Sequence, residues 1–203
     1  MKLAIVDYGM GNLHSLVGAL DYVSNIDVLV SSNIKDLRQA DKLILPGVGH
    51  FLSAMACIKD LGLDAVLKEL VIEEKTPILG ICLGMQLLTD SSDEGGYSDG
   101  LGFINGRATR FNSNELPVPH VGYNQVNAAV NSRLYDGFGP SPDFYFTHSH
   151  QLQSDCSIGQ STCHYGNDFI ASFEYENIAG VQFHPELSQT NGLKLLKNFV
   201  ELF

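Results

Sequence analysis

Short apolar runs alternate with amphipathic stretches along the first ninety residues of the chain. Residues 3–6, 26–30, 41–45 and 77–81 have the length of strands and are rich in apolar side chains. Between them, residues 13–23, about 50–73 and 83–89 carry apolar side chains at helical spacings of three and four. Apolar strands that alternate with helices are typical of a parallel sheet covered on both faces. The pattern therefore predicts an α/β fold with an open, mostly parallel sheet.

The second half of the chain has a different texture. Residues 91–102 are rich in Ser, Asp and Gly and are expected to form a loop, while residues 104–171 contain short strand-like runs separated by turn signals. A further strand is predicted over 178–183 and a terminal helix over 192–203. The short runs predict antiparallel strands that extend the parallel sheet. Because no linker interrupts the chain, residues 1–203 are expected to form a single domain.

Composition narrows the classes of partner. Twelve Lys and Arg against 23 Asp and Glu give a formal net charge of −11, which argues against nucleic acid and against an anionic membrane surface. The four cysteines form no Cys-x-x-Cys pair, so a zinc site is not expected. The N-terminal apolar run stops at Asp7, and no run reaches the ~18 apolar residues of a membrane helix. These features favour a cytoplasmic location.

One cysteine has the setting of a nucleophile. Cys82 lies in Gly80-Ile81-Cys82-Leu83-Gly84, where a predicted buried strand meets a predicted helix. This is a cysteine version of the Gly-x-Ser-x-Gly nucleophile elbow. A tight turn exposes the side chain, the helix N-terminus stabilises a thiolate, and the following N–H can donate to an oxyanion. The other cysteines, Cys57, Cys156 and Cys163, lack such a setting and are expected to be structural.

A nucleophilic thiol needs an imidazole base and a group that orients it. His184 ends the predicted strand 178–183, and Pro185 fixes the exit of the chain. Glu186 follows two residues later, where a curved backbone returns its carboxylate to the ring. His148 is the second candidate, although its place in an alternating strand favours a structural or substrate-lining role.

These segments together resemble the class I (triad) glutamine amidotransferases. The resemblance rests on Gly-x-Cys-x-Gly followed about a hundred residues later by His-Pro-Glu. It extends to Asp7–Leu13, Leu45–Gly49, Gly84–Gln86 and Tyr145–Ser149, which are most like the glutaminase subunits of imidazole glycerol phosphate synthases. It covers essentially the whole chain and implies a flavodoxin-like class I glutamine amidotransferase fold.

The resemblance also implies a reaction and roles for individual residues. Cys82 would attack the side-chain amide of L-glutamine to form a thioester, with His184 as base and Glu186 orienting it. Gly49 and Leu83 would supply the oxyanion-hole N–H groups. The remaining substrate contacts would come from Gly47, Gln86, Ser149 and His150. No metal and no cofactor is implied.

Ammonia would pass to a (β/α)₈-barrel cyclase in a heterodimer, which makes imidazole glycerol phosphate and an aminoimidazole carboxamide ribotide in histidine biosynthesis. The residues expected at that interface are Asn12, Tyr123, Tyr145 and Leu187. The family usually has Lys where this chain has Leu187, and often Trp where it has Tyr123. The alternative is therefore a paralogue that supplies ammonia to another acceptor, such as a sugar amidotransferase of surface-polysaccharide synthesis.

Two other classes are weighed against these. A cysteine hydrolase of the DJ-1/PfpI or gamma-glutamyl-hydrolase type would share the elbow, but residues 7–12 and 46–49 argue against it. A regulatory relative with a dead site would lack part of the triad, whereas Cys, His and Glu are all present. The sequence thus favours an active glutaminase.

Overall fold

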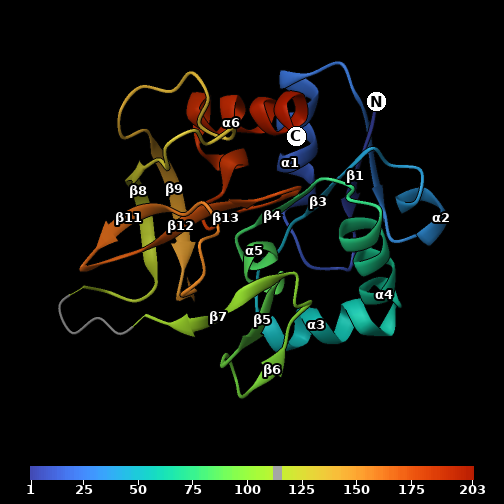
Figure 1. Ribbon diagram of the computed structural model, residues 1–203, viewed down its shortest axis with the longest axis horizontal. Helices are drawn as coiled ribbons and strands as arrows, with labels where there is room; N and C mark the ends of the chain where they lie inside the picture. The colour runs from blue at the N-terminus through green and yellow to red at the C-terminus, as the bar shows by residue number, and fades with distance from the viewer. Residues whose placement is uncertain (112–115) are drawn as a thin grey trace.

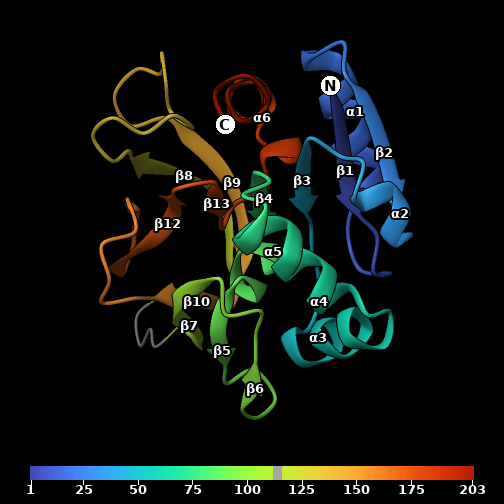
Figure 2. The ribbon, with the colours of Figure 1, turned by 45° about the vertical axis from the view of Figure 1, so that its right-hand side comes forward.

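Five parallel strands form the centre of the fold in a computed structural model that describes residues 1–111 and 116–203. In spatial order they are β2 (Asp27–Ser31), β1 (Lys2–Val6), β3 (Lys42–Leu45), β4 (Ile78–Ile81) and β13 (Ile178–Val181). Figure 2 shows β13 and β4 near the middle of the molecule and β3, β1 and β2 successively to their right. All five match runs predicted from the sequence to within one residue at their starts and two at their ends, and the parallel pairing is the one expected.

The two faces of this sheet are covered by different helices because strand side chains alternate. Leu3 and Ile5 pack with α1 (Leu13–Val23) and α6 (Gln189–Leu202), which lie side by side in Figure 1. Ala4 and Val6 face the opposite layer. That layer consists of α3 (Phe51–Asp60), α4 (Leu63–Lys68) and a π-helical turn, η1 (Glu69–Glu73), and Figure 2 shows α3 and α4 on the side of the sheet away from α6.

Mostly antiparallel strands extend the sheet beyond β13, as the turn-rich second half predicts. The extension runs through β12 (Asn167–Tyr175), β10 (His150–Gln153), β7 (Ile104–Arg110), β5 (Thr89–Ser92) and β6 (Ser98–Asp99). Its pairs are antiparallel except for β5 and β7, which run parallel and depart from the prediction. A branch from β12 adds β11 (Ser161–Tyr165), β8 (His120–Asn127) and β9 (Asp143–His148). Residues 112–115, which fall within the predicted strand-like region, lie outside the described residues.

Several predicted boundaries are wrong. The helix expected over about 50–73 is broken at Gly62, whose φ of +66° is left-handed and cannot continue an α-helix. The helix expected over 83–89 is α5 (Leu83–Leu87), and Thr89 already belongs to β5. Part of the expected loop 91–102 pairs as β5 and β6, and a short helix, α2 (Ile34–Leu37), was not predicted. The terminal helix expected over 192–203 is α6, which begins three residues earlier, at Gln189. The short elements were missed because periodicity carries little information over six residues or fewer.

Candidate active site

Cys82 occupies the turn between β4 and α5, as the elbow motif predicts. Its φ of +52° and ψ of −108° lie in a region that residues with a Cβ atom rarely adopt. Such strain persists only where the surrounding structure enforces it, and it is concentrated at functional sites. The turn carries Cys82 out of the sheet at the carboxyl end of β4, where ligands bind in open parallel sheets.

The two glycines of the motif are required by close packing. A Cβ atom on Gly84 would overlap the carbonyl oxygen of Leu45, which ends β3. A Cβ atom on Gly80 would lie 2.8 Å from the carbonyl group of Gly84 and from the Leu88 side chain. The turn that bears Cys82 is therefore packed directly against the backbone of β3 and of α5, and no larger residue fits at either position.

His184 and Glu186 form a buried ion pair at the end of the next strand. Val181 is the register partner of Ile81, so β13 delivers the following residues to the edge where Cys82 lies. The His184 Nδ1 atom is 2.8 Å from Glu186 Oε1, and the two side chains are only 4% and 3% exposed. Since a carboxylate accepts, Nδ1 donates its proton to Glu186 and Nε2 is the atom left for proton exchange.

The surroundings of His184 favour its protonated form. Burial by itself lowers the pKa of His184, but the Cys82 sulfur and the Glu186 carboxylate outweigh burial and raise this pKa to about 10. Within residues 1–111 and 116–203, Nε2 is buried without a hydrogen-bond partner. The imidazole is therefore able to take a proton from a nearby thiol and to hold it as an imidazolium.

A cavity of about 330 Å³ joins the nucleophile and the histidine. Gln86 and Glu94 also line it, and Glu94 is the only carboxylate that residues 1–111 and 116–203 contribute to its wall. Glu94 Oε1 lies 3.4 Å from His150 Nδ1, while Oε2 accepts a 2.8 Å bond from the Phe51 N–H at the start of α3. Glu94 was missed from the sequence because it falls in the Ser-, Asp- and Gly-rich stretch that carried no recognisable motif.

Most of the predicted substrate and oxyanion residues line the same cavity. Gly49, Leu83, Gln86, Ser149 and His150 are all in its wall. Gly49 has a φ of +106°, a conformation that favours glycine. Gly47 does not line the cavity and is instead buried against the Tyr8 hydroxyl and Leu83, where a Cβ atom would lie 2.5 Å and 2.8 Å away.

His148 also lines the cavity, but its ring nitrogens are already used. Nδ1 lies 2.8 Å from the His150 carbonyl oxygen and Nε2 lies 3.1 Å from His120 Nδ1. Burial lowers the pKa of His148 to about 3, so the ring is neutral at physiological pH. A neutral ring that donates to a carbonyl through Nδ1 must accept at Nε2, so His148 has a structural role rather than that of the base.

Three of the four predicted interface residues lie together. The Tyr123 hydroxyl donates a 2.8 Å bond to the Leu187 carbonyl, and the rings of Tyr123 and Tyr145 meet edge to face at 5.5 Å. Tyr123 and Leu187 are 46% and 40% exposed, and Val121 beside them is 56% exposed. Asn12 follows β1 at the start of α1 and shares no hydrogen bond or ring contact with the other three in the described part of the chain.

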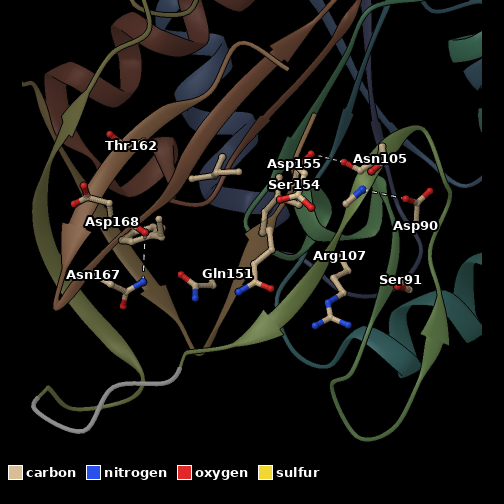
Figure 3. A pocket seen from close by; sticks show the side chains of 15 residues that line it. Asp90, Ser91, Asn105, Arg107, Gln151, Ser154, Asp155, Thr162, Asn167 and Asp168 are labelled. Carbon is tan, nitrogen blue, oxygen red and sulfur yellow. Dashed lines mark hydrogen bonds between the residues drawn. The ribbon is translucent and has the colours of Figure 1, made fainter. Parts of the chain in front are cut away.

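A larger cavity, of about 800 Å³, lies elsewhere. Figure 3 shows it between β7, β10 and β12, lined by polar side chains such as Arg107, Gln151 and Asp168. None of the predicted catalytic, oxyanion, substrate or interface residues lines it. Its described lining residues include no cysteine and no histidine, so its size does not make it the candidate active site.

In the described residues, 1–111 and 116–203, no group of three or more His, Cys, Asp or Glu side chains is arranged to hold a metal ion. No helix there is both long and apolar enough to span a bilayer.

Known proteins match this chain over nearly its whole length. The family profile described as glutamine amidotransferase class-I matches residues 4–202. "Imidazole glycerol phosphate synthase subunit HisH 1" of Campylobacter jejuni strain RM1221 is 44% identical, over 98% of this chain and 100% of the relative. The subunit named HisH 2 of Methanococcus maripaludis is 43% identical over 98% of each chain. A solved structure titled "Crystal structure of glutamine amidotransferase" has a TM-score of 0.76 at 17% identity, covering 98% of this chain and 97% of its own. The chain therefore belongs to the class I glutamine amidotransferase family, and it is similar throughout its length to HisH subunits.

Proposed function

We propose that this chain is the glutaminase subunit of an imidazole glycerol phosphate synthase, which hydrolyses L-glutamine and delivers ammonia to a cyclase subunit. The observation that carries the proposal is one cavity in which a strained cysteine faces a histidine held by a buried glutamate. Relatives at 43% and 44% identity whose names give this role support it.

The first half of the reaction uses Cys82, His184 and Glu186. His184 Nε2 takes the thiol proton, and Cys82 Sγ attacks the side-chain amide carbon of glutamine. The N–H groups of Leu83 and Gly49 donate to the oxygen of the tetrahedral intermediate, because Leu83 begins α5 and its N–H has no intrahelical acceptor. When the C–N bond breaks, His184 returns its proton to the leaving nitrogen, and ammonia departs. Glu186 keeps the ring in the tautomer that these transfers need.

The second half releases glutamate. Water attacks the thioester carbon and His184 takes one proton from the water. The C–S bond breaks to release the thiolate, and His184 returns the proton to the sulfur to regenerate the thiol. The same N–H groups of Leu83 and Gly49 stabilise this second tetrahedral intermediate.

Glu94 and Gln86 bind the amino-acid end of glutamine in this proposal. The Glu94 carboxylate in the cavity wall suits the α-ammonium group. Both N–H bonds of Gln86 Nε2 are used, by the His150 carbonyl at 3.1 Å and Gln182 Oε1 at 2.9 Å. Gln86 can therefore offer the substrate only its acceptor oxygen, which also suits an ammonium group.

The partner is a (β/α)₈-barrel cyclase that docks on the face formed by Tyr123, Tyr145 and Leu187. His184 N–H donates a 2.9 Å bond to the Tyr145 carbonyl, so this face is joined directly to the triad. A docked partner is thereby placed to act on the geometry of His184.

Two observations favour an alternative acceptor for the ammonia. Leu187 supplies an exposed apolar side chain where the family resemblance leads one to expect Lys. The names HisH 1 and HisH 2 also carry numbers, as is usual for one of several related subunits. On this alternative the chain is the same glutaminase, but it supplies ammonia to another synthase, such as a sugar amidotransferase.

The test follows glutamate release by the wild-type chain and by Cys82→Ala, with and without the histidine-pathway cyclase from the same source and its ribulosyl nucleotide substrate. Cys156→Ala is the matched control, because this exposed cysteine lies outside the cavity. We expect only Cys82→Ala to abolish release, and the cyclase to stimulate the wild type. Release at the native rate by Cys82→Ala would contradict the proposal. A live glutaminase that the cyclase neither binds nor stimulates would indicate the alternative acceptor.

A further inference from the structure

Gln182 is a fully buried polar side chain beside the nucleophile that no step above uses. It directly follows β13, and the parallel register with β4 brings it next to Cys82, whose N–H donates a 2.8 Å bond to the Val181 carbonyl. Its side-chain nitrogen, Nε2, lies 3.7 Å from Cys82 Sγ, within hydrogen-bond range for sulfur. A group in contact with the reacting atom at this distance is placed to affect its chemistry.

The direction in which the Gln182 amide points is fixed by a neighbouring backbone group. Gln86 Nε2 contacts both the His150 carbonyl oxygen and Gln182 Oε1. A backbone carbonyl only accepts, so Gln86 must turn its NH₂ group toward it, and the second contact of that NH₂ group must also be an acceptor. Gln182 therefore presents its oxygen to Gln86 and its NH₂ group to the sulfur. This assignment comes from the network and not from the shape of the amide.

An N–H donor at this point matters because Cys82 is only 7% exposed and a thiolate there has lost most of its water. Besides His184, which takes the thiol proton, the described residues give the sulfur a further polar contact with the Thr147 carbonyl oxygen at 3.9 Å, which can accept from a thiol but repels a thiolate. A carboxamide with its oxygen toward the sulfur would repel it in the same way. The chain from the His150 carbonyl through Gln86 to Gln182 excludes that orientation.

We propose that Gln182 is a further catalytic residue, whose side-chain N–H stabilises the Cys82 thiolate, and that Gln86 is a positioning residue that sets its direction. The inference rests on the proposed function, since it concerns the nucleophile of that reaction. Gln182 keeps both of its protons throughout: the thiol proton goes to His184, and the amide donates a hydrogen bond to the sulfur that remains. It loosens that bond when the thioester forms and restores it when the thiolate leaves.

The experiment measures alkylation of Cys82 by iodoacetamide as a function of pH in the full chain, read by mass spectrometry of the Cys82 peptide. Gln182→Met keeps the approximate volume and removes the donor. We expect the midpoint of its pH profile to rise by about one pH unit, which is roughly tenfold less thiolate at a fixed pH below the midpoint. Gln182→Glu should shift it further, because an oxygen then faces the sulfur. Gln39→Met, an exposed site far outside the cavity wall, is the matched control and should leave it unchanged.

Gln86→Met tests the positioning role. We expect a smaller rise of the midpoint, and we expect the Gln86→Met/Gln182→Met double variant to match Gln182→Met alone, since Gln86 acts through Gln182. A Gln182→Met profile within about 0.3 pH unit of wild type, in a variant with the wild-type circular dichroism spectrum, would overturn the inference. Fully additive shifts would overturn the positioning role of Gln86. If wild-type Cys82 resists both iodoacetamide and 6-diazo-5-oxo-norleucine, it is the proposed function that fails.

Discussion

The serine that follows the triad segment links His184 to the extension of the sheet. Ser188 Oγ accepts a 2.9 Å bond from the Tyr145 N–H and donates a 2.6 Å bond to the His184 carbonyl. The residue is 2% exposed, so water cannot replace its hydroxyl. Ser188→Ala removes both bonds without adding bulk, and we expect it to weaken both the fold and the reaction.

The two bonds do not cost the same. The His184 carbonyl keeps a second donor, the Leu187 N–H at 3.0 Å, so losing one of its two bonds costs about 0.5–1.5 kcal/mol. The Tyr145 N–H has no other recorded acceptor in the described residues and would be buried unpaired, at about 1–3 kcal/mol. The sum, about 1.5–4.5 kcal/mol, corresponds to a fall in Tm of roughly 3–18 °C for a chain of this size.

Two measurements check this prediction. Thermal unfolding gives Tm, and glutamate release is measured at a temperature well below the unfolding transitions of both the wild type and the variant. Ser24→Ala is the control. Ser24 Oγ donates to the Leu20 carbonyl, which also accepts from the Ser24 N–H, so this carbonyl keeps a hydrogen-bond donor in the variant. We expect Ser24→Ala to change Tm by no more than a few degrees and Ser188→Ala to slow release about tenfold as His184 loosens. If Ser188→Ala matched Ser24→Ala in Tm, the unpaired-donor reasoning would be wrong.

Three other variants give separate tests. Glu186→Gln keeps an acceptor for His184 but removes the charge, so glutamate release should fall roughly 10–100-fold; a fall under about twofold would count against the triad. Tyr8→Phe leaves the Pro46 carbonyl without its 2.8 Å buried donor and should lower the free energy of unfolding by about 1–3 kcal/mol in urea titrations, which an unchanged midpoint would contradict. Burial lowers the pKa of His148 to about 3, well below its unfolded value of about 6.5, so the unfolded chain binds the extra proton between these values and stability falls as pH drops through that window. His148→Asn should therefore lose less stability than wild type between about pH 7 and pH 5, and equal losses would refute this.

The parts of the site that the sequence predicted are those tied to regular elements. Cys82 was found because a glycine-flanked cysteine between an apolar strand and a helix has few other uses, and His184 because it ends a strand. The register between β4 and β13 then brings them to one edge, which no local pattern specifies.

Glu94 and Gln182 could not be found in the same way. Glu94 is positioned by its bond to the Phe51 N–H, 43 residues earlier in the chain, and its own segment reads as a polar loop. Gln182 lies in a strand-like apolar run, and the sequence does not say which way its side-chain amide points. That orientation is set only in the folded chain, by Gln86 and the His150 carbonyl. The break at Gly62 was missed for a related reason, since a left-handed residue leaves the apolar spacing around it intact.

The backbone conformation of Cys82 has a consequence for how position 82 can evolve. A residue with a Cβ atom at φ +52° and ψ −108° costs about 1–3 kcal/mol that glycine would not. A lineage that abandoned the reaction would gain stability by replacing this cysteine with glycine, and ordinary mutation would offer that change repeatedly. Position 82 is thus a marker of selection: descendants that still carry cysteine there are those in which the chemistry continues to be needed, and homologues with glycine are expected to be inactive.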